Sequence, residues 1–201
     1  LPPLRLLHRL DKDTSGVLLV SKDDSSFGKF GEMFEKRSLE KIYIALALGT
    51  PKKLRGYIDA PIDRSPHDRQ KFAISDSSTS RRALTAYQVI DFFGAFSLWA
   101  LQIHTGRTHQ IRVHLSSIGH PIIGDETYGT DKSLRAGLDI GSKRQLLHAY
   151  QISFKHPVTK KNIIISAPLP FDFKQILGKL SNTKYKLPAF NFSDYDYHHQ
   201  W

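Results

Sequence analysis

The sequence has no cysteine. A chain without thiols forms no disulfide framework and no thiolate metal site, which fits a reducing compartment. It also lacks an apolar run near the roughly 20 residues of a membrane-spanning helix. A phosphate-cradling glycine loop and internal repeats are likewise missing. These absences predict a protein that lies outside the membrane and uses no metal and no cofactor. Its 201 residues suffice for one sizeable hydrophobic core.

Acidic residues are few beside basic ones. The chain has 19 Asp and Glu against 29 Lys and Arg, a formal net charge of +10. The basic residues recur along the chain instead of gathering in a tail, which indicates a basic face on a folded body. Such a face favours a polyanionic partner, because each neutralised phosphate releases a condensed counterion. An ordinary solvated surface is the alternative.

Apolar periodicity predicts strands and helices in mixed order. A helix capped near Asp23 is expected to bury Phe27, Phe30 and Phe34, and a second is expected between a Thr108 cap and Gly119. Pro170 opens a third. Residues 130–141 are expected to form an irregular loop. Strands are expected at residues 17–20, 41–48, 57–62, 83–93, 96–104, 145–154 and 162–166.

The segment from His8 to Gly16 concentrates polar chemistry in a few positions. It holds a carboxylate at Asp11, basic residues, two hydroxyls and a glycine, and it leads directly into the apolar residues 17–20. Catalytic groups are often found on a polar loop fixed against a rigid strand. Asp11 is therefore the first candidate for chemistry. The alternative is that Asp11 or Asp13 only stabilises a turn.

Arg107 and Tyr43 are the next candidates. Arg107 stands where an expected strand meets an expected helix, and a fixed guanidinium suits a carboxylate or a phosphate. A structural ion pair is the alternative. Tyr43 shares its strand face with the small residues Ala45 and Ala47, which leaves room beside the ring. A core tyrosine is the alternative there.

Four motifs, in order and at a suitable spacing, resemble the RluA family of pseudouridine synthases. The resemblance implies an α+β fold with a mixed, largely antiparallel sheet, flanking helices and a central RNA-binding cleft. It implies a catalytic domain at residues 1–180 and a C-terminal extension at 181–201, which we expect to be peripheral. The motifs are His8-Arg9-Leu10-Asp11 with Thr14-Ser15-Gly16; Lys41-Ile42-Tyr43; Gly106-Arg107-Thr108-His109-Gln110-Ile111-Arg112-Val113-His114-Leu115 with Gly119-His120-Pro121 and Gly124-Asp125; and Leu147-His148-Ala149 with Phe154-Lys155-His156-Pro157.

The family isomerises uridine in RNA, so the resemblance implies an enzyme acting on ribosomal RNA, with transfer RNA as the second choice. Asp11 then is the essential aspartate, Arg107 the arginine paired with it, and Tyr43 the aromatic residue that packs on the target base. Burial disfavours an ionised carboxylate and a close guanidinium favours it, so we expect Arg107 to keep the aspartate charged.

Three further residues are expected to contact RNA. Arg9 matches an arginine that enters the stack where the flipped base has left it. Arg69 and Lys71 lie in a segment that resembles a basic loop of many members, and we expect them to touch backbone phosphates.

The sequence departs from the family at its amino end. Members usually carry a strand and a Lys-Pro segment before the first motif, and many carry an S4 RNA-binding domain. Because the sequence starts at Leu1, we expect it to be a fragment or processed product. A cytoplasmic monomer is expected, with an organelle as the alternative. An RNA-binding module without activity and a metal-dependent hydrolase using the histidines are the competing functions.

Overall fold

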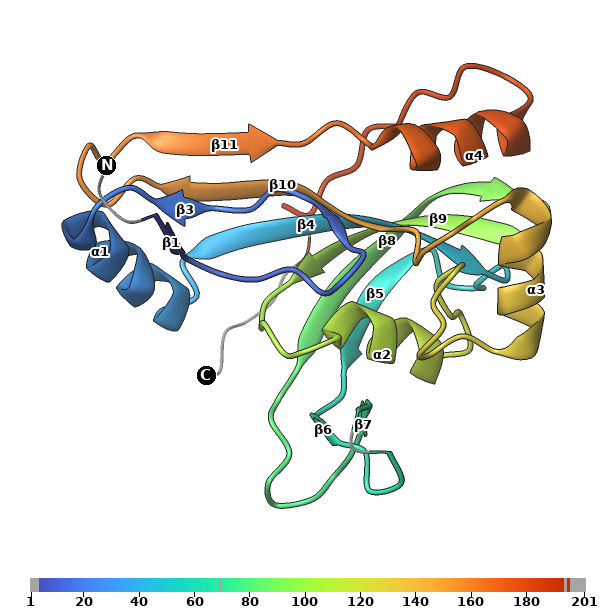
Figure 1. Cartoon of the computed structure of the whole chain (residues 1–201), viewed down its shortest axis with the longest axis horizontal. Helices are drawn as coiled ribbons and strands as arrows, with labels where there is room; N and C mark the ends of the chain where they lie inside the picture. Colours follow the sequence, from blue (N-terminus) through green and yellow to red (C-terminus); the bar gives the residue numbers. More distant parts are fainter. Residues whose placement is uncertain (1–3, 69, 194, 196–201) are drawn as a thin grey trace.

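The computed structural model describes residues 4–68, 70–193 and 195. Its centre is a twisted sheet, shown in Figure 1, in which all neighbouring strands are antiparallel except one parallel pair. The expected mixed, largely antiparallel sheet is confirmed. Its strands are β2 (Ser15–Gly16), β4 (Leu39–Leu48), β5 (Arg55–Asp59), β8 (Leu84–Phe93), β9 (Phe96–Ile103), β10 (Leu147–Lys155) and β11 (Asn162–Ser166). They lie in the order β11-β10-β4-β9-β8-β5, and β2 pairs in parallel with β10.

Two short pairs of strands lie outside this sheet. β1 (Arg5–Leu6) pairs with β3 (Val20–Ser21), and β6 (Ile62–Arg64) pairs with β7 (Phe72–Ile74). The β6–β7 hairpin projects from the body in Figure 1. The helices are α1 (Asp24–Glu35), α2 (Gln110–Ser117), α3 (Asp131–Ile140) and α4 (Phe171–Ser181). Of these helices, none is long and apolar enough to cross a bilayer.

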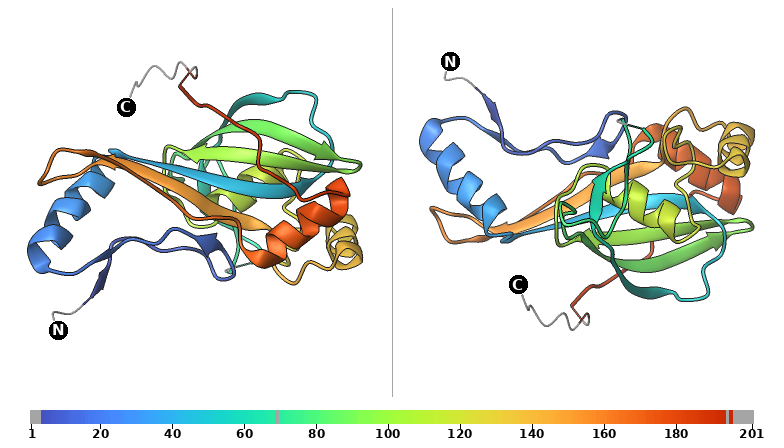
Figure 2. Two further views of the ribbon diagram at one scale, coloured as in Figure 1. Left: turned by 90° about the horizontal axis from the view of Figure 1, so that it is seen from above. Right: turned by 90° about the horizontal axis from the view of Figure 1, so that it is seen from below.

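The alternation along β4 divides the core into two layers, as the sequence predicts. Ala45 and Ala47 face one cluster, which α2 completes, while Ile44 and Leu46 face the other, which α4 completes. Figure 2 shows these two helices on opposite faces of the sheet. Both faces of β4 are therefore buried, and its side chains are held rigidly.

Three local expectations are wrong. Residues 131–140 form α3, because a capping box between Thr130 and Ser133 starts a helix that carries few buried side chains. The 17–20 run is no continuous buried strand, since β2 ends before it and Leu18 is exposed. Thr108 does not cap α2. The N-cap is His109, whose backbone is left-handed.

The described part of the segment after α4, residues 182–193 and 195, is not peripheral. The Tyr185 hydroxyl donates to Asp91 at 2.8 Å, and the Tyr195 hydroxyl donates to the Tyr87 carbonyl at 2.5 Å. Leu187, Phe190 and Phe192 pack against the cluster that α4 completes. This segment therefore belongs to the core layer on that face of the sheet.

Gly16 is required where the N-terminal loop joins the sheet. Its φ is +123°, and a Cβ there would lie 2.1 Å from the Ala149 carbonyl oxygen. We expect Gly16→Ala to lower the free energy of unfolding by about 1–3 kcal/mol, through strain and loss of the β2–β10 pairing. Urea unfolding measures this. The control is Gly28→Ala, at an open position on α1, which should gain up to about 1 kcal/mol. Equal stability of the two variants would contradict the assignment.

Candidate active site

One cavity of about 470 Å³ opens beside α1 on the α2 side of the sheet. Its walls come from the N-terminal loop, the end of α1, β4, and the turn from β9 into α2. Four of the residues singled out by the sequence line it together: Arg9, Asp11, Tyr43 and Arg107. The fold thus gathers into one hollow residues that are far apart in the chain.

The ion-pair partner of Asp11 is Arg112. Arg112 Nη1 lies 3.7 Å from Asp11 Oδ2, and the two side chains are 6% and 19% exposed respectively. Arg112 stands in the first turn of α2, a helix whose residues from 110 to 115 are all buried. A positive charge therefore compensates Asp11 at a partly buried position on the cavity wall.

A second carboxylate holds this guanidinium in place. Arg112 Nε and Nη2 donate to the two oxygens of Asp125 at 2.7 and 2.8 Å, and Asp125 is buried. Burial lowers the pKa of Arg112, but the hydrogen bond and charge of Asp125, with the charge of Asp11, outweigh it and raise that pKa. The Tyr128 ring lies 5.0 Å from the guanidinium carbon. Arg112 is thus charged and fixed in one orientation.

The expected pair between Asp11 and Arg107 is wrong. Arg107 Nε donates to the Arg82 carbonyl at 3.0 Å, and within the described chain Asp11 is in an ion pair with Arg112 alone. The sequence has two arginines close together, Arg107 and Arg112. The residue at which α2 begins determines which of them pairs with Asp11. Since α2 begins at Gln110, Arg112 is turned inward and Arg107 stays in the preceding turn. An arginine directly between the apolar residues Ile111 and Val113 of the expected helix was the available signal.

The loop that carries Asp11 is pinned to the sheet by side chains at and before the start of β10. Gln145 Nε2 donates to the Lys12 carbonyl at 2.6 Å, and Arg144 donates to the Asp13 carbonyl at 2.9 Å. The Ser15 hydroxyl lies 2.8 Å from His148 Nδ1. These contacts fix the backbone on the C-terminal side of Asp11.

Tyr43 lies half-buried on the cavity wall, on the same face of β4 as Ala45. Burial raises its pKa, and the negative charge of Asp11, which lines the same cavity, raises it further. An aromatic ring beside a paired carboxylate can stack on a flat base while the carboxylate faces the base or its sugar.

The β6–β7 hairpin is tied to the same helix. The Tyr128 hydroxyl accepts from the Phe72 backbone N–H at 2.9 Å and lies 2.8 Å from His109 Nδ1. Lys71, just before β7, makes a 4.0 Å ion pair with Asp68. Arg69 lies outside the described residues.

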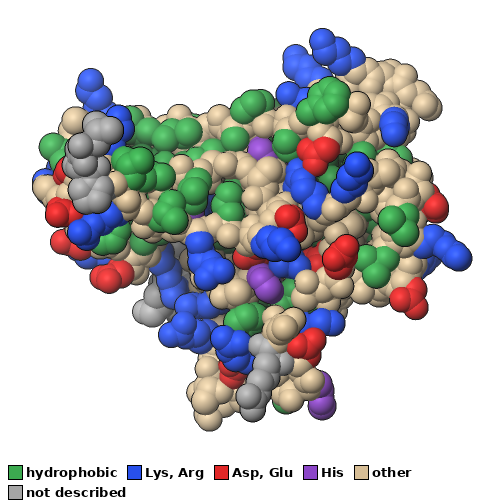
Figure 3. Space-filling model, viewed as in Figure 1, with side chains coloured by type: hydrophobic (Ala, Val, Ile, Leu, Met, Phe, Trp, Pro, Cys, Tyr) green, Lys and Arg blue, Asp and Glu red, His purple; other side chains and the backbone are tan. Residues whose placement is uncertain are grey.

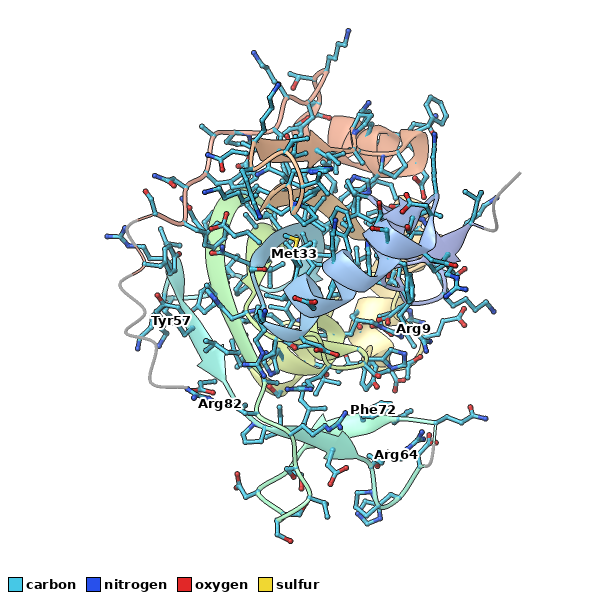
Figure 4. The ribbon with its side chains drawn as sticks, turned by 90° about the vertical axis from the view of Figure 1, so that its left-hand side faces the viewer. Arg9, Met33, Tyr57, Arg64, Phe72 and Arg82 are labelled. Carbon is cyan, nitrogen blue, oxygen red and sulfur yellow. The ribbon has the colours of Figure 1, made fainter. Side chains whose placement is uncertain are left out.

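The cavity lining holds four basic side chains, Arg9, Arg37, Lys41 and Arg107, and two acidic ones, Asp11 and Glu35. In Figure 3, Lys and Arg side chains gather below α1, between the body and the β6–β7 hairpin. Figure 4 shows the same region from the side, with Arg9 to the right of α1 and with Arg82, Phe72 and Arg64 below it. Among the described side chains, no three His, Asp or Glu residues come together as metal ligands.

A model of the RNA pseudouridylate synthase family matches residues 2–117. The chain belongs to this family. The family expected from the four motifs is thereby confirmed. The chain is 41% identical over 177 residues to "Ribosomal large subunit pseudouridine synthase D" of Zymomonas mobilis, covering 87% of this chain and 55% of that protein. It is 37% identical over 196 residues to "RNA pseudouridine synthase 2, chloroplastic" of rice, covering 87% and 44%.

Solved structures of pseudouridylate synthase domains share the fold. "Human RNA Pseudouridylate Synthase Domain Containing 1" superposes with a TM-score of 0.77 and 29% identity, covering 94% of this chain and 77% of that one. The chain spans about half the length of the curated relatives that it matches.

Proposed function

We propose that this pseudouridine synthase family member isomerises uridine to pseudouridine in RNA, with Asp11 as its catalytic group. The observation that carries the proposal is the Asp11 carboxylate on the wall of a 470 Å³ cavity, paired with Arg112 and beside the Tyr43 ring. A cavity of this size suits a nucleotide. Ribosomal RNA of the large subunit is the first substrate class to test, because relatives carry that name.

The chemistry needs only what the cavity holds. The bond between N1 of uracil and C1′ of ribose breaks, the uracil turns, and a bond forms between C5 and C1′. The proton from C5 is replaced by one on N1, so nothing is oxidised and no water is consumed. An ionised carboxylate can attack the sugar or the base, or remove a ribose proton, and all three routes use Asp11. Arg112 keeps that group compensated and oriented.

Tyr43 and Arg9 are proposed to offset the free energy needed to move the uridine out of its stack. Taking a uridine out of its stack costs a few kcal/mol, and stacking on an aromatic ring returns about 1–3 kcal/mol. Tyr43 offers that ring inside the cavity, and Arg9 lies exposed at its edge, where it can fill the gap left in the RNA. Lys71, with Arg69 two residues before it in the sequence, is proposed to contact phosphates farther along the RNA.

The deciding experiment uses RNA that contains no pseudouridine. Large-subunit ribosomal RNA and transfer RNA transcribed in vitro are incubated with the protein, and pseudouridine is mapped by carbodiimide modification and primer extension. We expect one or a few sites in ribosomal RNA. Binding of both RNAs without product would contradict the proposal and favour an RNA-binding module of the same fold. Product only in transfer RNA would keep the activity and change the substrate.

A further inference from the structure

A second group of charges lines the cavity, apart from the Asp11–Arg112 pair. Arg37 follows α1, Lys41 is in β4, and Arg107 lies in the turn before α2. Lys41 Nζ lies 5.3 Å from the centre of the Phe34 ring, and a Cβ placed at Gly106 would be 3.8 Å from it. The ammonium therefore lies against the turn that carries Arg107.

The Arg107 guanidinium is held in place with hydrogen-bonding capacity to spare. Its Nε donates to the Arg82 carbonyl at 3.0 Å, which fixes the plane of the group. Burial lowers the pKa of Arg107, and so do the like charges of Arg37 and Arg81. The positive charges of Arg37 and Arg81 thus act on the Arg107 guanidinium, which lines the cavity together with Arg37.

Within the described residues, Lys41, Arg81 and Arg107 make no ion pair with Asp or Glu within 4.0 Å. Arg82 provides the contrast, since it pairs with Asp59 at 3.1 Å. Bringing like charges together at a partly desolvated wall is unfavourable unless an anion joins them.

We infer that Lys41 and Arg107, with Arg37 and Arg81 around them, form a phosphodiester subsite that holds the RNA backbone beside the uridine whose base enters the cavity. A fixed guanidinium fork matches phosphate oxygens, and an ammonium adds a point charge. The inference rests on the proposed function, because it takes the occupant of the cavity to be a nucleotide. Arg107 is then a substrate-binding residue, and the pairing of Asp11 belongs to Arg112.

The test pairs altered protein with altered RNA. The probe is a fluorescein-labelled 12-nucleotide single-stranded RNA with one central uridine, made with natural linkages or with neutral methylphosphonates on both sides of that uridine. Fluorescence anisotropy gives Kd at several KCl concentrations. The variants are Lys41→Met and Arg107→Gln, and the control is Lys132→Met at an exposed position on α3.

The wild type and the Lys132→Met control should prefer the natural RNA. Each subsite variant should lose most of that preference, and its plot of log Kd against log salt should be shallower by about 0.7, the value for one phosphate contact on a single strand. Arg107→Lys and Lys41→Arg keep the charge and should retain part of the preference, which separates loss of charge from misfolding. If both neutral variants prefer the natural RNA as strongly as the wild type, the subsite is refuted.

Catalysis provides an independent readout. On the transcript that the wild type modifies, both neutral variants should raise KM about tenfold, with a much smaller change in kcat. A fall in kcat at unchanged KM would overturn the inference. If the wild type makes no pseudouridine at all, the proposed function fails, but the binding comparison still decides whether the subsite recognises a phosphodiester.

Discussion

Replacing Asp11 by asparagine should lower the rate of pseudouridine formation by about 10³-fold or more. Asparagine has the same shape as aspartate but lacks the negative charge that attack or proton removal requires. The side chain is 19% exposed, so the substitution should disturb the fold little and leave RNA binding intact. Single-turnover rates, with the protein in saturating excess over the transcript that the wild type modifies, measure the effect.

Asp13 offers a matched control two residues away. It is exposed and has a φ of +66°, a conformation that asparagine adopts readily. Asp13→Asn should therefore keep nearly the full rate, because the contact that Asp13 makes with Arg144 uses its backbone carbonyl. A wild-type rate for Asp11→Asn would remove the proposed catalytic role of Asp11. Equal losses in both variants would point to damage of the loop instead.

Arg112→Met should lower both stability and activity. The guanidinium is 6% exposed and lies between Asp125, 1% exposed, and Asp11. Removing it leaves a buried carboxylate without its partner, at a cost of about 3–5 kcal/mol in the free energy of unfolding. It also leaves Asp11 without its counter-charge, so the rate at saturating RNA should fall as well. Urea unfolding and the pseudouridine assay measure the two effects.

A surface arginine in a similar ion pair serves as the control that separates the effect of burial on stability from the effect of losing a charge. Arg82 pairs with Asp59, and both side chains are more than two-fifths exposed. Arg82→Met should cost less than about 1 kcal/mol, because water screens the pair and solvates the remaining carboxylate. If Arg112→Met costs no more than Arg82→Met, the buried Arg112–Asp125 pair contributes no more to stability than an exposed pair does.

The two substitutions test different properties of one cavity wall. Asp11 is proposed to act on the substrate, so its loss should affect rate and spare stability. Arg112 lies behind it, bonded to Asp125 in the interior, so its loss should affect both. An aspartate in a purely structural turn would give the opposite result for Asp11.

Much of this protein follows from short-range sequence pattern. Alternation along 41–48 predicted that Ala45 shares a face with Tyr43 and that Ile44 lies on the other, because side chains alternate along a strand. The hairpin of β8 and β9 at Gly94, where φ is +58°, followed from two apolar runs around a glycine. α3 was missed because the residues that it buries are Ser133 and Gly137, which are not the large apolar residues that mark a buried helix face in a sequence.

The sequence by itself determined the family and the basic character, and it put forward Asp11 and Tyr43 as the candidates that line the cavity, because these rest on residue type and on order along the chain. Tertiary structure alone decided which arginine reaches Asp11. The carboxylate comes from a loop pinned beside β10, the guanidinium from a helix whose first residue sets its direction, and Asp125 fixes it from behind. Side chains that are far apart in the chain come together only through the packing of the sheet and helices. The local sequence pattern does not specify the distance between them.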